Sequence, residues 1–189
     1  FTDRFITIMM TKQLNIGVVG LGYWWPNLAR NFNGLPNCIL KTVCDLSEDR
    51  LKHITSLYPQ AHGESDFDNL IQDPDLDAIV IATAVKFHHP LAKAALLAGK
   101  HVFIEKPLAS STEQSEELVA IAREEGLIIM VGHTFLYSPA IRKIKEIVDS
   151  GDIGDIRYIC ARRLNLGLFQ KDINVCLLYT SDAADDVRG

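Results

Sequence analysis

Short apolar runs alternate with segments of helical periodicity over most of the chain. Residues 14–20, 38–45, 76–83, 101–106 and 127–132 are the expected strands. The segments between them, residues 26–35, 47–58, 88–100 and 110–126, have the spacing expected of helices. Because strand–helix–strand units of this length give parallel strands joined by crossover helices, the sequence predicts an α/β fold with a Rossmann-like, doubly wound parallel sheet.

The pattern changes toward the carboxyl end of the chain. Residues 139–156 predict a helix followed by a glycine stop and a turn, and residues 157–167 predict a strand of alternating character. Alternation indicates a sheet with one polar face, whereas the earlier apolar runs indicate strands that are covered on both faces. We therefore expect a domain boundary near residues 135–150.

The two ends of the sequence do not continue this pattern. Residues 176–189 contain CLLYTSDAADD, which looks like the translation of a widely used transposon-end sequencing adapter, although a natural acidic tail is the alternative. Met9 or Met10 is a plausible start. We expect residues 1–11 to be a non-native leader and residues 176–189 to be an artefactual tail.

Composition excludes several classes of protein. Apolar residues make up 48% of the chain and charged residues 23%, which is typical of a globular protein. The net charge is −5 and the sequence has no basic stripe, so we expect no nucleic-acid partner. No apolar run reaches the roughly 18 residues of a membrane span, and no pair of cysteines has the C-x-x-C spacing of a metal site. We expect a cytoplasmic protein with no membrane partner and no metal.

A glycine turn follows the first expected strand. Gly20 and Gly22 occupy the first two glycine positions of a dinucleotide-binding G-x-G-x-x-G turn, and Trp25 replaces the third. The first glycine allows the tight turn, the second lets the backbone approach the pyrophosphate, and the third allows close helix packing. Asp45 closes the second strand, where an acidic residue would hold the adenosine ribose, although a turn or capping role is the alternative. An acid there favours NAD, and Arg50 nearby leaves NADP possible.

Several longer segments carry a family resemblance. ATAVKFHHPLAKAALLAGKHVFIEKPLA, residues 82–109, resembles the signature of the Gfo/Idh/MocA family, and GLGYWWPN resembles its branch that acts on nucleotide-linked or related sugars. The resemblance covers about residues 12–175. It implies a Rossmann domain over residues 12–135 and, from residue 136 to 175, the truncated start of a substrate domain with a mostly antiparallel sheet. It also implies an NAD(P)-dependent oxidoreductase that acts on a sugar or sugar nucleotide and associates as a homo-oligomer.

The same resemblance implies roles for particular residues. Glu105 and Lys106 belong to the family's E-K-P motif, in which the lysine reaches the nicotinamide ribose and the reacting hydroxyl. Thr83 and His88 fall on a loop that lies against the cofactor, although helix capping is the alternative for His88. The remaining cofactor contacts expected are Tyr23 and Trp24, and the remaining substrate contacts expected are His133, Tyr137, Arg163 and Asn165.

One family feature has no counterpart in the chain. The family pattern places an aspartate and a histidine several residues beyond the point where this chain turns into adapter-like sequence. That histidine is generally the proton-transfer partner, and no residue of the chain can be assigned its role. The alternative function is therefore a non-catalytic nucleotide-binding module.

Overall fold

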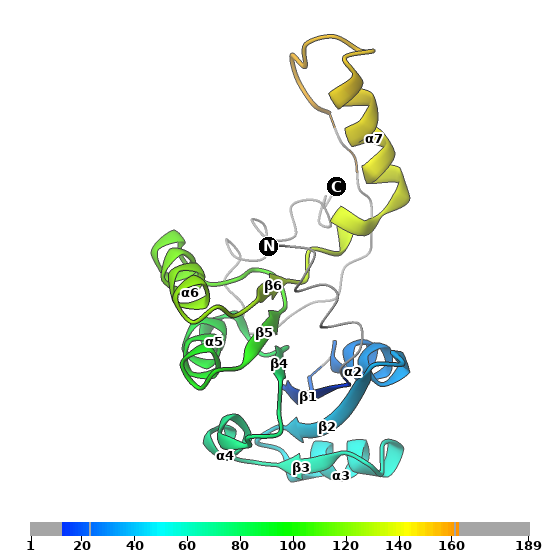
Figure 1. Cartoon of the computed structure of the whole chain (residues 1–189). Helices are drawn as coiled ribbons and strands as arrows, with labels where there is room; N and C mark the ends of the chain where they lie inside the picture. The colour runs from blue at the N-terminus through cyan, green and yellow to red at the C-terminus, as the bar shows by residue number, and fades with distance from the viewer. Residues whose placement is uncertain (1–12, 23, 161, 163–189) are drawn as a thin grey trace. The chain divides into compact units, whose positions relative to one another are not determined.

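The computed structural model describes residues 13–22, 24–160 and 162, and most of them belong to one α/β unit (Figure 1). Its sheet has six parallel strands in the order β3-β2-β1-β4-β5-β6. The strands are β1 (Leu14–Val19), β2 (Cys38–Cys44), β3 (His62–Glu64), β4 (Ala78–Ile81), β5 (His101–Ile104) and β6 (Ile129–Val131). This order, in which the chain starts in the middle and builds outward in both directions, confirms the predicted doubly wound Rossmann-like sheet.

Helices connect the strands. They are α2 (Trp25–Gly34), α3 (Glu48–Leu57), α4 (Phe67–Gln72), α5 (His88–Leu97) and α6 (Thr112–Glu124), with a short 3-10 helix η1 (Val85–Phe87) before α5. Side chains cap three of them, because Ser47, Asp66 and Ser111 each accept a backbone N–H from the first turn of α3, α4 and α6. Such caps satisfy donors that the helix itself leaves without an acceptor.

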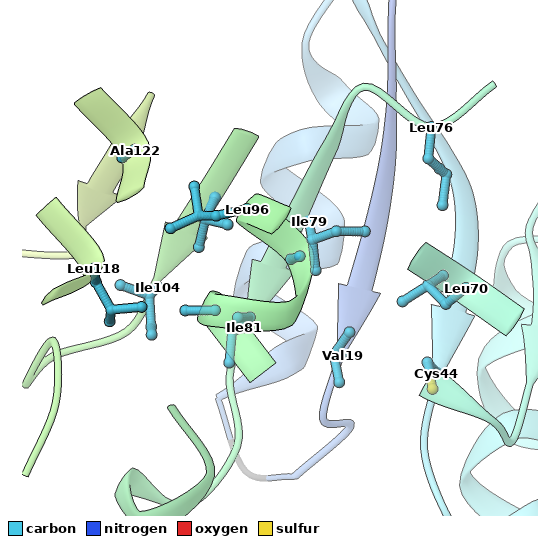
Figure 2. Packing of buried hydrophobic residues seen from close by; sticks show 13 residues of the cluster. Val19, Cys44, Leu70, Leu76, Ile79, Ile81, Leu96, Ile104, Leu118 and Ala122 are labelled. Atoms are coloured by element: carbon cyan, nitrogen blue, oxygen red, sulfur yellow. The ribbon is translucent and has the colours of Figure 1, made fainter. Parts of the chain in front are cut away.

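Two hydrophobic clusters lie on opposite faces of the sheet. Figure 2 shows the first, in which strand residues such as Val19, Ile79 and Ile81 meet helix residues such as Leu96 and Leu118. The second cluster joins strand residues to α2 and α3; its buried members are Ile16, Val18, Leu21, Trp25, Leu28, Ala29, Leu40, Val43, Ile54, Ala61 and Val80. Because successive side chains of a strand point to opposite faces, continuous apolar runs fill both clusters.

Gly17 shows how closely the helices cover the central strand. A Cβ atom at this position in β1 would lie 3.1 Å from side-chain atoms of both Ile79 and Leu70. The absence of a side chain therefore lets α4 lie close to the sheet.

The chain divides into two units between Val131 and Gly132. The described part of the second unit contains the 3-10 helix η2 (Thr134–Tyr137) and helix α7 (Pro139–Ser150), which ends at Gly151 with a φ of 75°. That left-handed conformation is the usual glycine stop of a helix. The predicted domain limits at residues 135 and 136 stay a prediction.

Two parts of the sequence prediction differ from the fold. The predicted strand over 157–167 is absent from its described part, residues 157–160 and 162. A strand needs a neighbour to accept its hydrogen bonds, and the described residues after Gly132 supply none. Conversely, β3 and α4 were not predicted. Among the described helices, none combines the length and apolar character needed to span a bilayer.

Candidate cofactor site

The strands of the sheet end at one level. In the register of the sheet, Val19 pairs with both Cys44 and Ile81, and Ile81 pairs with Ile104. The ladder continues one residue further, since Gly20 donates to the carbonyl of Cys44 at 2.9 Å, Ala82 to Val19 at 2.9 Å and Glu105 to Ile81 at 3.0 Å. The residues that follow four strands, which are Asp45, Gly20, Ala82 and Glu105, therefore form a row along one edge.

This edge contains the point where the strand order reverses. From β1 the chain turns to α2, which contributes to the second cluster, and from β4 it turns to α5, which contributes to the first. The two loops therefore leave the sheet toward opposite faces. In open α/β sheets, ligands bind in the crevice outside the carboxyl ends of the strands at such a reversal.

Gly20 is required by its surroundings. Its φ is +88°, and a Cβ atom there would lie 2.8 Å from the carbonyl oxygen of Ala82 and 2.7 Å from Cγ2 of Thr83. Left-handed backbone at this point turns the chain sharply after β1, and the missing side chain lets it pass against the loop that follows β4. These are the features that a tight dinucleotide turn requires.

Gly22 lies in a different environment. A Cβ atom there would meet nothing within 4 Å, so its backbone faces open space. Helix α2 begins three residues later, and its N-cap residue Trp24 makes no side-chain cap hydrogen bond. Trp24 is 43% exposed and its indole can only donate, so the start of α2 carries neither a capping oxygen nor an acidic residue in its first turn. A half-buried glycine with open space where a side chain would be, beside a helix N-terminus, suits a phosphate group.

Asp45 holds this turn from the neighbouring strand. Its Oδ2 atom accepts the backbone N–H of Leu21 at 2.7 Å, and its Oδ1 atom accepts that of Ser47 at 2.9 Å. The guanidinium of Arg50 lies 3.5 Å from Oδ2. The carboxylate therefore performs the turn role considered as an alternative, and because each oxygen has two acceptor sites it retains capacity for a ribose hydroxyl.

His88 and Thr83 form the wall on the other side of the reversal. His88 is 1% exposed, and its Nδ1 and Nε2 atoms lie 2.8 Å and 3.0 Å from the carbonyl oxygens of Pro107 and Thr83. Burial lowers the pKa of His88, against the opposing effect of the two carbonyls. Both ring nitrogens thus face backbone atoms, and direct contact of this ring with a cofactor stays a prediction.

Glu105 and Lys106 continue the row after β5. Both residues are half-buried, and the peptide bond from Lys106 to Pro107 is cis. Lys106 is the second residue after β5, and the expectation that its side chain reaches the ligand crevice stays a prediction. Its role in binding stays a prediction.

Trp25 is part of the hydrophobic core. It begins α2, is 7% exposed and belongs to the same cluster as Leu28 and Ala29. The side chain that replaces the third glycine of the motif is therefore buried beneath the helix and does not fill the open space beside Gly22. The structure accommodates the substitution that made the motif incomplete.

The other predicted residues belong to the second unit or lie outside the described residues. His133 and Tyr137 are exposed residues of the second unit, where the guanidinium of Arg142 lies 5.6 Å from the centre of the Tyr137 ring. Tyr23, Arg163 and Asn165 lie outside the described residues.

Together, the reversed strand order, the glycine turn and the uncapped helix start define the class of dinucleotide-binding Rossmann domains. The chain belongs to the GFO_IDH_MocA oxidoreductase family with an NAD-binding Rossmann fold, whose profile matches residues 14–133.

Known relatives agree with this assignment. A dTDP-3,4-didehydro-2,6-dideoxy-alpha-D-glucose 3-reductase of Streptomyces violaceoruber is 38% identical over 151 residues, 79% of this chain and 44% of the relative. The apo scyllo-inositol dehydrogenase of Lactobacillus casei superposes with a TM-score of 0.71 at 30% identity, covering 76% of this chain and 44% of that one. KijD10, a 3-ketoreductase of Actinomadura kijaniata solved with NADP and TDP-benzene, gives 0.71 at 31%, with 77% and 45% covered. The chain thus spans less than half the length of these relatives.

Proposed function

We propose that the protein is an NAD(P)-dependent oxidoreductase that transfers a hydride between a hydroxyl-bearing carbon of a sugar or sugar nucleotide and nicotinamide. The observation that carries this proposal is the shared edge of the sheet, where the Gly20–Gly22 turn and Lys106 both follow strand ends at the same level. We infer that the turn binds phosphate and that the cationic side chain serves the same ligand across the strand reversal.

The residues present fit a dinucleotide. Gly22 leaves the space that a side chain would fill, and the start of α2 offers a positive helix end to the pyrophosphate. Asp45 is a fixed acceptor beside the turn and would take a ribose hydroxyl, which favours NAD, while Arg50 beside it keeps NADP in the proposal. When bound, the nicotinamide ring supplies hydride chemistry.

Lys106 is the residue that we assign to the reacting hydroxyl. An ammonium group has three donors and no acceptor, so it would orient a substrate oxygen and stabilise negative charge that develops on it. Polyhydroxylated substrates are proposed because the relatives include an inositol dehydrogenase and a reductase of a dTDP-linked sugar.

A second domain completes the proposal. We place it from residue 136 onward, with a mostly antiparallel sheet that binds the substrate and associates into a homo-oligomer. The described part of the second unit exposes apolar side chains that such a sheet would cover, among them Ile141, Ile144, Ile153 and Ile156.

The test has two stages. NAD and NADP are titrated separately into the protein by calorimetry, with adenosine alone as a control for binding that does not use the pyrophosphate turn. A panel of inositols, free sugars and sugar nucleotides is then assayed for formation of reduced nicotinamide. Saturable dinucleotide binding followed by turnover supports the enzyme, whereas binding without turnover on any panel member supports the non-catalytic module.

A further inference from the structure

His88 connects two loops that the proposed function assigns to one site. It opens α5, yet its ring is almost completely buried, with 1% of its surface exposed. Nδ1 lies 2.8 Å from the carbonyl of Pro107, and Nε2 lies 3.0 Å from the carbonyl of Thr83. Pro107 directly follows Lys106, and Thr83 belongs to the loop that follows β4.

The Thr83 loop (residues 82–84) is itself in close contact with the glycine turn. A Cβ atom on Gly20 would lie 2.7 Å from Cγ2 of Thr83 and 2.8 Å from the carbonyl oxygen of Ala82. The turn, the Thr83 loop and the Lys106 loop (residues 105–110) therefore form a connected series, in which the imidazole of His88 makes the last connection.

We propose that His88 is a positioning residue, which fixes the backbone of the Lys106 loop to the backbone of the Thr83 loop and so sets the place of Lys106 relative to the glycine turn. The importance of this position for catalysis rests on the proposed function. The connection between the loops does not, because it is a property of the folded chain without any cofactor.

The chemistry of the ring explains why a histidine is suited to this place. Carbonyl oxygens only accept, so each contact needs an N–H from the ring, and a five-membered ring presents its two nitrogens in divergent directions. A neutral imidazole has one N–H and satisfies one carbonyl fully, whereas the second nitrogen then contacts its carbonyl without a proton between them. Asparagine places a donor near the position of Nδ1 and glutamine places one near Nε2, so the two contacts are separable by substitution.

The test measures hydrogen–deuterium exchange of both loops without cofactor. His88→Leu removes the one N–H donor of the neutral ring and both polar contacts, and we expect exchange in both loops to rise about fivefold or more, as loss of about one hydrogen bond implies. His88→Asn retains the donor to Pro107 and should protect the Lys106 loop better than the Thr83 loop, and His88→Gln should show the reverse. His89→Gln is the matched control, because the neighbouring His89 contacts Glu117 of α6 at 2.6 Å.

Wild-type exchange of both loops in all three His88 variants overturns the proposal. If His88→Leu does not fold, the opposite patterns of the asparagine and glutamine variants decide it, and identical patterns in those two contradict it. A dinucleotide titration is run in parallel, with a several-fold weaker affinity expected for His88→Leu and partial recovery for one of the amide variants. Failure of the wild-type chain to bind NAD or NADP would contradict the proposed function. The exchange result would still test whether His88 connects the two loops.

Discussion

The carboxylate of Asp45 accepts the backbone N–H of Leu21 at 2.7 Å, so the residue that follows β2 holds the turn that follows the neighbouring strand β1. Leu21 is 2% exposed, and its N–H has little access to water. We expect Asp45→Ala to lower the free energy of unfolding by about 1–3 kcal/mol, because it leaves a buried donor unsatisfied. Asp45→Asn, which retains one acceptor oxygen, should lose less. Urea denaturation measures both, and equal stability of Asp45→Ala and wild type would contradict the role.

Substitutions of Gly20 and Gly22 are expected to affect different properties, stability at Gly20 and dinucleotide affinity at Gly22. Gly20→Ala places a Cβ atom at positive φ and 2.8 Å from a backbone oxygen, so we expect a loss of about 2 kcal/mol or more in the free energy of unfolding. Gly22→Ala adds a methyl group in open space and should be within about 1 kcal/mol of wild type, since φ is not positive there. Its dinucleotide affinity should nevertheless fall about tenfold or more, because the methyl group occupies the proposed phosphate approach. Wild-type affinity of Gly22→Ala would exclude that approach.

Trp25 replaces the third glycine of the motif and adds a buried side chain to the core. Trp25→Gly should cost about 3–5 kcal/mol in the free energy of unfolding, since it empties a core position next to Leu28 and Ala29. Trp25→Phe, which retains most of the apolar volume, is the control and should cost less. If the indole also hinders the turn, Trp25→Gly binds NAD more tightly, as calorimetry below its unfolding temperature would show; equal affinity would mean that the indole affects stability alone.

Lys106 is tested by a neutral replacement of similar length. Lys106→Met should reduce turnover by about 100-fold or more if the ammonium orients the reacting hydroxyl or transfers a proton to or from it. Affinity for the dinucleotide should change by no more than about threefold, because the proposed pyrophosphate contacts come from the glycine turn. Lys86→Met is the control, since Lys86 is exposed on η1 and lies 5.0 Å from the ring centre of Phe87. Equal turnover of Lys106→Met and wild type would remove Lys106 from the site.

His88 gives a pH dependence of known sign. Burial lowers its pKa below the ordinary 6.5, so between the two pKa values the unfolded chain binds more protons than the folded chain. The contribution of His88 to the free energy of unfolding is therefore fully present above pH 6.5 and is lost as the pH falls toward the folded-state pKa. Urea denaturation from about pH 7.5 to about pH 5 should show a steeper decline for wild type than for His88→Gln.

Two carboxylates contribute to the pH dependence of stability at lower pH. Hydrogen bonds from Lys41 and Lys93 lower the pKa values of Asp73 and Glu117, whose ordinary values are 3.8 and 4.5. Their contribution is present above those values and is lost below them. Parallel profiles for wild type and His88→Gln above pH 5 would contradict the effect assigned to His88.

Hydrophobic patterning was sufficient to predict most of the sheet. The long apolar runs around β1, β2 and β4 are buried on both faces, and burial of that kind leaves a strong sequence signal. By contrast, β3 is a three-residue edge strand of His62, Gly63 and Glu64, whose pairing with β2 depends on backbone bonds. Such a strand has no apolar period to detect.

The site was predictable only in part for a related reason. Glycines after a strand have a conformational cause that sequence reveals, and Gly20 and Gly22 were found in this way. The partners of Asp45 and His88 are backbone atoms, namely the N–H of Leu21 and the carbonyls of Thr83 and Pro107. Since nearly every residue has such atoms, only the fold determines which of them lie within reach.

The common level at which the central strands stop also bears on how such a protein changes during evolution. Each loop beyond that level starts from its own strand, while the two apolar layers lie below it along the strands. Insertions into a single loop would remodel the rim of the crevice without repacking either layer. New ligand preferences are therefore accessible through changes in the length of one connection at a time.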